Sequence, residues 1–307
     1  LFLTKGLMVT GIIILLSSIC TYFISRQALL PLRRLSQEVN KIEAQNLSKT
    51  LEVPATNDEI SRLTISFNKM LARLDEAFTA QKQFSANAAH ELRTPLAVIQ
   101  TNLEVFARRE TPALKDYQEI FAMLQEQTGR LSHLAEILLD MTGVQTVERS
   151  ERISLAALTD EVFCDLASVA EQKDVELIQQ EGDCIITGSY LLLYRAVYNL
   201  VENAIKYNHS GGKVTVNIHL SEEITDTSAS VNYVFLEVSD TGIGIPPEYQ
   251  EKIFTPFFRV DKSRSRAMGG AGLGLALVSE IVRQHNGQVK VLESSKKGSV
   301  IAIMLPV

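Results

Sequence analysis

A histidine followed by a carboxylic acid and, five residues on, by a proline is the arrangement in this chain best suited to nucleophilic chemistry. The segment 84–96 reads FSANAAHELRTPL and places His90 and Pro95 in a helical pattern. A neutral imidazole has one nitrogen free to attack phosphorus. Proline in a helix interior costs about 3 kcal/mol, so a weak turn follows His90. Alone, such a histidine is more often an ordinary surface residue, but the segment as a whole favours the reactive interpretation.

A hydroxyl group lies one helical turn beyond the histidine. Thr94 is four residues after His90, so the two side chains share a helix face. There a hydroxyl can position a water molecule that dephosphorylates a partner protein. Thr94 is therefore a candidate catalytic residue.

Two asparagines in the segment NLVENAIKY suggest a metal and phosphate site. Asn199 and Asn203 are four residues apart and share a helix face, where their amide oxygens can complete a Mg²⁺ shell. Lys206 adds a positive charge near the phosphates, and Tyr207 adds an aromatic face. Taken alone, such a pair is more often part of a solvated helix face.

The segment DTGIGIP follows an apolar run that predicts a strand. Asp240 can accept a hydrogen bond from an adenine amino group. Gly242 and Gly244 let the backbone approach the base without obstruction by a Cβ atom. An ordinary turn after a strand is the competing interpretation.

A third glycine-rich segment, GGAGLGLALV, leads into an apolar helix. The amino end of that helix, with Gly270, Gly272 and Gly274, can hold phosphate oxygens through backbone N–H groups. A dinucleotide fold is rejected because no strand directly precedes the glycines and no opening βαβ unit contains them. The sequence also lacks the GxxxxGK[ST] phosphate loop.

The run FTPFFRVDKSRSR at 254–266 is interpreted as a mobile lid, although a bare charge run is usually a solvated loop. Phenylalanines anchor it, and its cations can reach a triphosphate. Those cations are Arg259, Lys262, Arg264 and Arg266.

Alternating strand and helix patterns predict a separate α/β domain over residues 152–307 that positions these motifs. The polar stretch 221–230 is predicted as a hairpin loop. The expected strands are 214–220, 231–238, 288–292 and 299–304, and the expected helices are 155–172, 189–208 and 273–284.

Residues 81–147 read as a helical hairpin whose narrow apolar stripes predict a dimeric four-helix bundle. Residues 29–80 read as two shorter amphipathic helices, with Asn57 or Asp58 placed to cap the second. Their stripes consist of Leu32, Leu35, Val39 and Ile42, then Ile60, Leu63, Phe67, Met70 and Leu74.

The uncharged run from Gly6 to Ile24 predicts a transmembrane helix within residues 1–28, because about 20 apolar residues cross a bilayer. A signal peptide and a buried helix are the alternatives. Arg26, Arg33 and Arg34 follow the run, so we expect the later domains in the cytoplasm at the inner or plasma membrane. The net charge of −6 argues against direct nucleic-acid binding, and three cysteines without metal spacing argue against a thiolate metal site.

The ordered motifs resemble those of bacterial membrane-bound sensor histidine kinases of two-component systems. HELRTP at 90–95 resembles their phosphoacceptor box, and residues 29–80 resemble a HAMP relay domain, with Ser61 where glycine is common. Residues 152–307 resemble their Bergerat (GHKL-type) α/β sandwich, shared with gyrase-type and chaperone ATPases. Ser189 stands where that family often has aspartate and is expected to cap the next helix.

The resemblance implies a multidomain homodimer that uses ATP and Mg²⁺ to phosphorylate His90 and passes the phosphate to an aspartate of a separate response regulator. It implies that Glu91 orients the imidazole of His90, and that Glu91 and Thr94 support phosphatase activity toward the regulator. Two alternatives stay open. One is a gyrase-like or chaperone-like ATPase without phosphohistidine. The other is a membrane scaffold that binds nucleotide only to change shape, or a sensor that acts mainly as a phosphatase.

Overall fold

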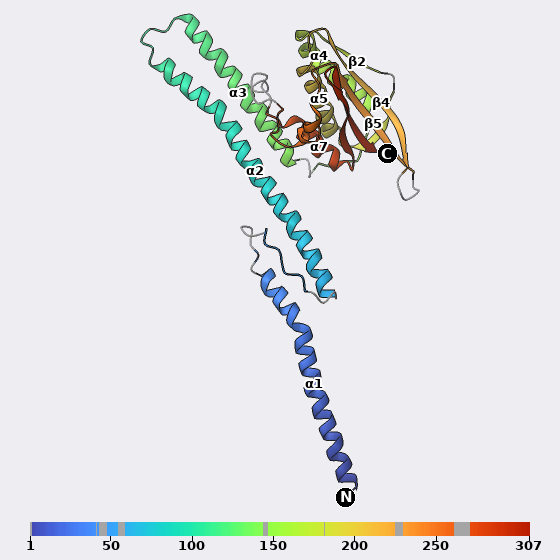
Figure 1. The fold of residues 1–307 in the computed structure, drawn as a ribbon. Coiled ribbons are helices and arrows are strands. Elements are labelled where there is room, and N and C mark those ends of the chain that lie inside the picture. The colour runs from blue at the N-terminus through green and yellow to red at the C-terminus, as the bar shows by residue number, and fades with distance from the viewer. Residues whose placement is uncertain are drawn as a thin grey trace. The chain divides into compact units, whose positions relative to one another are not determined.

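The structure, a computed structural model, forms two compact units, Leu1–Ala86 and Asn87–Val307. Figure 1 shows its helices and strands. It describes residues 2–40, 42, 48–54, 59–143, 147–180, 182–224, 230–260 and 271–307.

The first unit is built from helix α1 (Phe2–Val39) and the amino-terminal part of helix α2 (Glu59–Ala107). A small apolar core forms where Leu51, in the connector between the helices, packs against Leu71 of α2. The Asn68 side chain fixes this connector, because its Nδ2 donates to the Leu51 carbonyl and its Oδ1 accepts from the Leu51 N–H, each at 2.9 Å. Four residues of the predicted stripes pack against this core: Leu35, Val39, Ile42 and Phe67.

Other residues of the predicted stripes stay open to solvent in the single chain. Leu63, Met70 and Leu74 are each about half exposed. An apolar seam of this kind is typical of helices that pack against further helices. The predicted cap at Asn57 or Asp58 lies outside the described residues.

The apolar run 6–24 lies within α1, and its described side chains from Gly11 to Phe23 are exposed. In the part of the chain that the structure describes, no helix combines the length and the apolarity that crossing a membrane requires. The transmembrane segment therefore stays a prediction.

The predicted helical hairpin is confirmed. Helix α2 continues through Pro95 to Ala107, and helix α3 spans Leu114–Gly143. At the closed end the rings of Phe106 and Tyr117 meet edge to face, with centroids 5.0 Å apart. Asp116 begins α3 by accepting the Ala113 N–H at 2.8 Å.

The predicted α/β domain is confirmed as well, with its main sheet in the order β2-β4-β5-β7-β6. Strands β2 and β4 are parallel, and the other neighbours are antiparallel. A second, two-stranded sheet pairs β1 (Glu151–Ser154) with β3 (Ile185–Gly188). The main sheet consists of β2 (Val175–Gln179), β4 (Gly212–Ile224), β5 (Ser230–Asp240), β6 (Gln288–Ser295) and β7 (Gly298–Pro306).

Three helices cover one face of this sheet: α4 (Leu155–Gln172), α5 (Tyr190–Lys206) and α7 (Gly274–Gln284) (Figure 1). Strand residues alternate as the pleat requires, so Val214 and Val216 of β4 are fully buried while Thr215 between them is partly exposed. The packed helices and strands hold the cavity described below.

Sequence patterns missed some strands. The short strands β1, β2 and β3 were not predicted, because four or five residues carry little periodicity. The predicted loop at 221–230 is wrong at both ends, since Ser221 pairs with Tyr233 and Ile224 with Ser230. Antiparallel pairing continues there because the neighbouring strand fixes the register, whatever the polarity of the side chains.

A buried histidine joins the carboxyl end of α7 to the start of α5. The Nε2 atom of His285 accepts the Ser189 N–H at 3.1 Å, and its Nδ1 lies 2.8 Å from the Ile281 carbonyl. Ser189 is the residue before α5, as predicted, but its side chain makes no capping hydrogen bond with any described residue. The prediction that the Ser189 hydroxyl caps this helix is therefore wrong, and its backbone N–H anchors α7 instead.

This bond requires a neutral imidazole with the proton on Nδ1, because a protonated Nε2 cannot accept a hydrogen bond. Burial lowers the pKa of His285 from its ordinary value of 6.5, and the nearby Arg149 lowers it further, while the hydrogen bond to Ile281 acts in the opposite direction. A lowered pKa stabilises the folded state above pH 6.5, and that contribution is lost as the pH falls through the folded pKa.

We expect the free energy of unfolding to fall below pH 6.5, and His285→Gln to remove part of that dependence. The variant should also lose about 1–3 kcal/mol at neutral pH, because it leaves buried partners unpaired. Chemical denaturation across a pH series measures both effects. His209→Gln, at an exposed histidine, is the matched control and should keep the wild-type slope. Equal slopes in all three proteins would contradict the assignment.

Candidate active site

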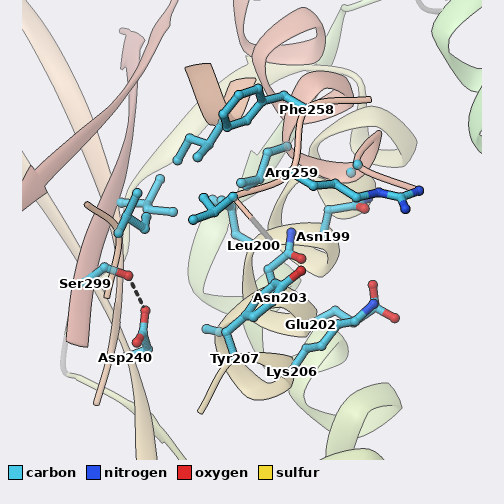
Figure 2. Close-up of a pocket in the computed structure, with 18 of the residues that line it drawn as sticks. Asn199, Leu200, Glu202, Asn203, Lys206, Tyr207, Asp240, Phe258, Arg259 and Ser299 are labelled. Carbon is cyan, nitrogen blue, oxygen red and sulfur yellow. Dashed lines mark hydrogen bonds between the residues drawn. The ribbon is translucent and has the colours of Figure 1, made fainter. Parts of the chain in front are cut away.

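A cavity of about 390 Å³ opens between α5, the end of β5 and the start of α7. This volume is in the range of small-molecule sites, roughly 300–1,000 Å³. Four predicted residues reach it from α5 and its carboxyl end: Asn199, Asn203, Lys206 and Tyr207. Four more reach it from the end of β5, the turn that follows and the start of α7: Asp240, Gly244, Gly272 and Gly274. The structure therefore brings together eight predicted residues that span 76 positions of sequence (Figure 2).

The other predicted binding residues have different positions. Gly242 is next to the cavity rather than in its wall, and its N–H donates to Asp240 Oδ1 at 2.8 Å. Arg266 and Gly270 lie outside the described residues.

The amide of Asn199 is oriented by its own helix. Its Nδ2 donates to the Arg195 carbonyl at 2.8 Å, and the residue is only 9% exposed. The Oδ1 atom then points toward the start of α7, where a Cβ added to Gly274 would lie 2.6 Å from it. An amide oxygen in this position suits a hard divalent cation, which fits the predicted Mg²⁺ ligand set with Asn203.

Asp240 lies on the opposite side of the cavity, at the end of β5 (Figure 2). Its Oδ2 accepts a hydrogen bond from Ser299 Oγ at 2.5 Å, while its Oδ1 accepts the Gly242 N–H. Each carboxylate oxygen has a second lone pair, so the fixed side chain can still accept a further donor. The carboxylate is therefore free to accept from an adenine amino group, and that contact stays a prediction.

The turn after Asp240 needs glycine for a reason that the sequence did not reveal. Gly244 has φ +69°, and a Cβ at this position would lie 1.8 Å from the Ser295 carbonyl oxygen. The protein's own backbone fills that space, whereas we had expected it to admit a base. The glycine therefore lets this turn pack against the β6–β7 hairpin.

Lys206 supplies a partly buried positive charge at the end of α5. Burial lowers its pKa, and the nearby cations Arg259, Lys173 and Arg130 act in the same direction, while Glu202 opposes them. Figure 2 shows Lys206 and Glu202 next to each other. Because its surroundings disfavour the charged form of Lys206, binding of an anionic ligand next to it is electrostatically favourable.

The start of the predicted lid is described and forms part of the wall. Two short 3-10 turns, η2 (Pro247–Tyr249) and η3 (Lys252–Phe254), precede it. Phe258 lines the cavity and stacks obliquely on Tyr249, with centroids 5.6 Å apart. The predicted anchors were Phe254, Phe257 and Phe258, and of these Phe258 lines the cavity. Ile253, just before the run, is buried at 7% exposed.

The phosphoacceptor segment reaches this wall through an ion pair. Arg259 Nη2 lies 2.8 Å from Glu91 Oε2, and Arg259 also lines the cavity. His90 precedes Glu91 on α2, and Thr94 Oγ1 donates to the His90 carbonyl at 3.1 Å. The described side chains of His90 and Glu91 form no hydrogen bond with each other. The Glu91 carboxylate instead accepts a hydrogen bond from Arg259.

Sequence reasoning missed several residues of the wall. Ser299 reaches Asp240 from β7, and His133 and Ile137 reach the cavity from α3. Arg259 was predicted only as a possible phosphate ligand, without its partner Glu91. No local signal identifies such residues, because each contact joins segments far apart in the chain.

Three families match the chain in order. Residues 23–76 match the HAMP domain, and residues 80–146 match the His Kinase A (phospho-acceptor) domain. Residues 188–307 match the Histidine kinase-, DNA gyrase B-, and HSP90-like ATPase family. The cavity lies within the last two matches.

Two curated sensor kinases are similar to the chain over most of its length. The chain is 31% identical over 279 residues to the sensor histidine kinase CusS of Escherichia coli K12, covering 90% of this chain and 56% of that protein. It is 30% identical over 297 residues to the signal transduction histidine-protein kinase ArlS of Staphylococcus aureus USA300, covering 94% of this chain and 63% of that protein. The chain thus spans a little over half the length of these relatives.

Solved structures share the fold. The histidine kinase ThkA, in complex with the response regulator protein TrrA, aligns with a TM-score of 0.59 at 21% identity, covering 81% of this chain and 68% of that chain. The Acinetobacter baumannii histidine kinase AdeS aligns with a TM-score of 0.53 at 23% identity, covering 71% of this chain and 97% of that chain. At these identities the likeness is one of fold.

We expect Gly274→Ala to weaken ATP binding by about ten- to a hundredfold, because a methyl group 2.6 Å from Asn199 Oδ1 forces the two helices apart and overpacking costs roughly 1–3 kcal/mol. Isothermal titration with Mg-ATP measures the change. Gly129→Ala on α3, where an added Cβ meets no atom within 4 Å, is the matched control. Unchanged affinity in Gly274→Ala would show that the close approach does not support the site.

Proposed function

Because the chain belongs to the two-component sensor histidine kinases, we propose that it phosphorylates His90 with ATP and passes the phosphoryl group to an aspartate of a response regulator. One observation carries the proposal. The Arg259–Glu91 ion pair joins the wall of the nucleotide cavity to the residue beside His90. The acceptor helix therefore contacts the nucleotide site itself.

Different residues of the cavity bind different parts of Mg-ATP in this proposal. Asp240 accepts the adenine amino group, and the amino end of α7 at Gly274 faces the phosphates with its backbone N–H groups. Asn199 and Asn203 hold Mg²⁺ through their amide oxygens, and Lys206 balances phosphate charge. Arg266 and Gly270, outside the described residues, are proposed to complete the phosphate contacts. Mg-ATP, when bound, supplies the γ-phosphoryl group.

His90 is the proposed nucleophile. One ring nitrogen forms the phosphorus–nitrogen bond while ADP leaves, and the other nitrogen carries the proton. Glu91 is the proposed acceptor for that N–H, which holds the imidazole in the reactive tautomer. Thr94, one turn beyond His90, is proposed to position the water that dephosphorylates the regulator.

A homodimer is the proposed form of the enzyme. On the hairpin, α2 and α3 expose large apolar side chains that a single chain leaves uncovered: Leu96, Leu103, Leu114, Phe121 and Leu139. A second copy that covers them makes a four-helix bundle. We propose the division into an anchor (1–28), a HAMP relay (29–80), a dimerisation and phosphotransfer hairpin (81–147) and a catalytic domain (152–307).

Anchoring in the inner or plasma membrane is proposed for residues 6–24, with the later domains in the cytoplasm. The run contains no charged residue, and arginines follow it. Direct contact with nucleic acid is not proposed, because the net charge of −6 offers little to attract a phosphate backbone.

Incubation with γ-labelled ATP should place acid-labile, base-stable label on the protein, and His90→Gln should abolish it, since glutamine offers no nucleophilic ring nitrogen. The label should then pass to a candidate response regulator. His209→Gln, at an exposed histidine, should label normally.

ATP hydrolysis that persists in His90→Gln, with no label on the wild-type protein, would favour the gyrase-like ATPase instead.

In the same assay, Thr94→Ala should slow dephosphorylation of a phosphorylated regulator and leave the labelling of His90 intact. Unchanged dephosphorylation would remove Thr94 from the phosphatase step.

Replacing Ile13 and Leu16 together by arginine should release the protein from membranes, because each central arginine costs roughly 2.5–3.5 kcal/mol on insertion. Alkaline extraction of cell membranes, followed by quantification of the pellet, measures this. Leu191→Arg, an exposed leucine on α5, should stay in the pellet. A wild-type protein that alkali fully extracts would contradict the anchor.

A further inference from the structure

Arg259 takes part in two features of the structure. Its Nη2 binds Glu91 Oε2 at 2.8 Å, and the residue also lines the nucleotide cavity, among whose residues Figure 2 labels it. The side chain of Arg259 is 6% exposed, whereas that of Glu91 is 33% exposed. A cation buried to this degree needs an anion next to it.

The ion pair uses only part of the binding capacity of Arg259. A guanidinium carries five N–H donors in a rigid plane, and this geometry also matches phosphate. The Nε atom of Arg259 is buried and has no hydrogen-bond partner in the described ranges. A buried donor without a partner is rare, so the pair with Glu91 leaves the hydrogen-bonding capacity of Arg259 incompletely used.

The surrounding charge favours such a ligand. Lys206 lines the same cavity, and Arg259 is among the cations that lower its pKa after burial. Two cations that disfavour each other are both stabilised when a phosphate enters between them. The terminal phosphate therefore has an electrostatic reason to take Arg259 from Glu91.

Release of Glu91 need not detach the hairpin from the catalytic domain. Arg195 of α5 forms a second ion pair with Asp140 of α3. Leu134 and Ile137 of α3 are buried, and α3 packs against α7. Glu91 can therefore change partners while these contacts stay in place.

We propose that Arg259 determines selectivity for a triphosphate by exchanging the carboxylate of Glu91 for the terminal phosphate of ATP. ADP lacks that phosphate and leaves the Arg259–Glu91 pair closed. Once freed, Glu91 becomes available to the neighbouring imidazole of His90, so the base is released only when a transferable phosphate is present. The inference rests on the nucleotide binding proposed above.

The test is a double-mutant cycle in nucleotide affinity. Glu91→Gln, Arg259→Gln and the double variant are titrated with Mg²⁺ and either the β,γ-imido analogue of ATP or ADP. Glu91→Gln should tighten the triphosphate analogue by about fivefold or more, in the usual range of coupling between two sites, because Arg259 no longer has a competing anion. ADP affinity should stay unchanged in Glu91→Gln, and far-UV circular dichroism reports that all three variants are folded.

Arg259→Gln should weaken the analogue and cancel the effect of Glu91→Gln. Arg283→Gln, at a surface arginine paired with Glu280 away from the cavity, is the control that should change neither affinity. An equal shift for both nucleotides, no shift in Glu91→Gln, or the same gain in the Arg259→Gln background would each overturn the exchange. The last outcome would assign the gain to simple repulsion between Glu91 and phosphate.

This measurement is independent of phosphohistidine. If His90 is never labelled but the cycle shows the expected coupling, the kinase proposal fails and the exchange stands. If His90 is labelled normally and the cycle shows no coupling, the exchange fails and the kinase proposal stands.

Discussion

The packing of α5 against both the sheet and the neighbouring helix α7 is the constraint on which the cavity depends. Leu200, Val201 and Ile205 of this helix are buried to 2% exposure or less. The same helix must hold Asn199 and Asn203 toward a polar ligand. Successive helix residues point about 100° apart. The helix can therefore bury its apolar residues and point its asparagines into the cavity only if its rotation about its own axis is fixed. Close contact with α7 supplies that restraint.

Two contacts fix α7 relative to α5, one at each end of α7. At its start, Gly274 allows the backbone to approach Asn199 so closely that a methyl group would collide with the amide oxygen. At its end, His285 accepts the N–H of Ser189, the residue before α5. The first contact shapes the cavity wall beside Asn199, and the second lies outside the cavity. The geometry of the site therefore depends on a buried hydrogen bond that touches no ligand.

Charge links this cavity to the phosphoacceptor helix. The wall carries Lys206 and Arg259, and the only acid that Arg259 pairs with among the described residues is Glu91, beside His90. Buried ion pairs are sensitive to a competing anion, because the loss of one partner leaves a charge that must find another. In the proposed exchange, the charge of a bound nucleotide competes with Glu91 for Arg259. This coupling between the cavity and the helix of His90 needs no hinge motion.

Residue type and spacing alone determined the helical hairpin, the later strands and the eight predicted residues of the cavity wall. Asn199, Asn203, Asp240 and Gly274 were predictable because helix periodicity and glycine chemistry are local properties. Tertiary structure alone decided the pairing of Glu91 with Arg259, 168 residues apart, and of Asp240 with Ser299, 59 residues apart. Local periodicity says which face of an element a side chain occupies, but the partner across the fold is chosen by how those faces pack.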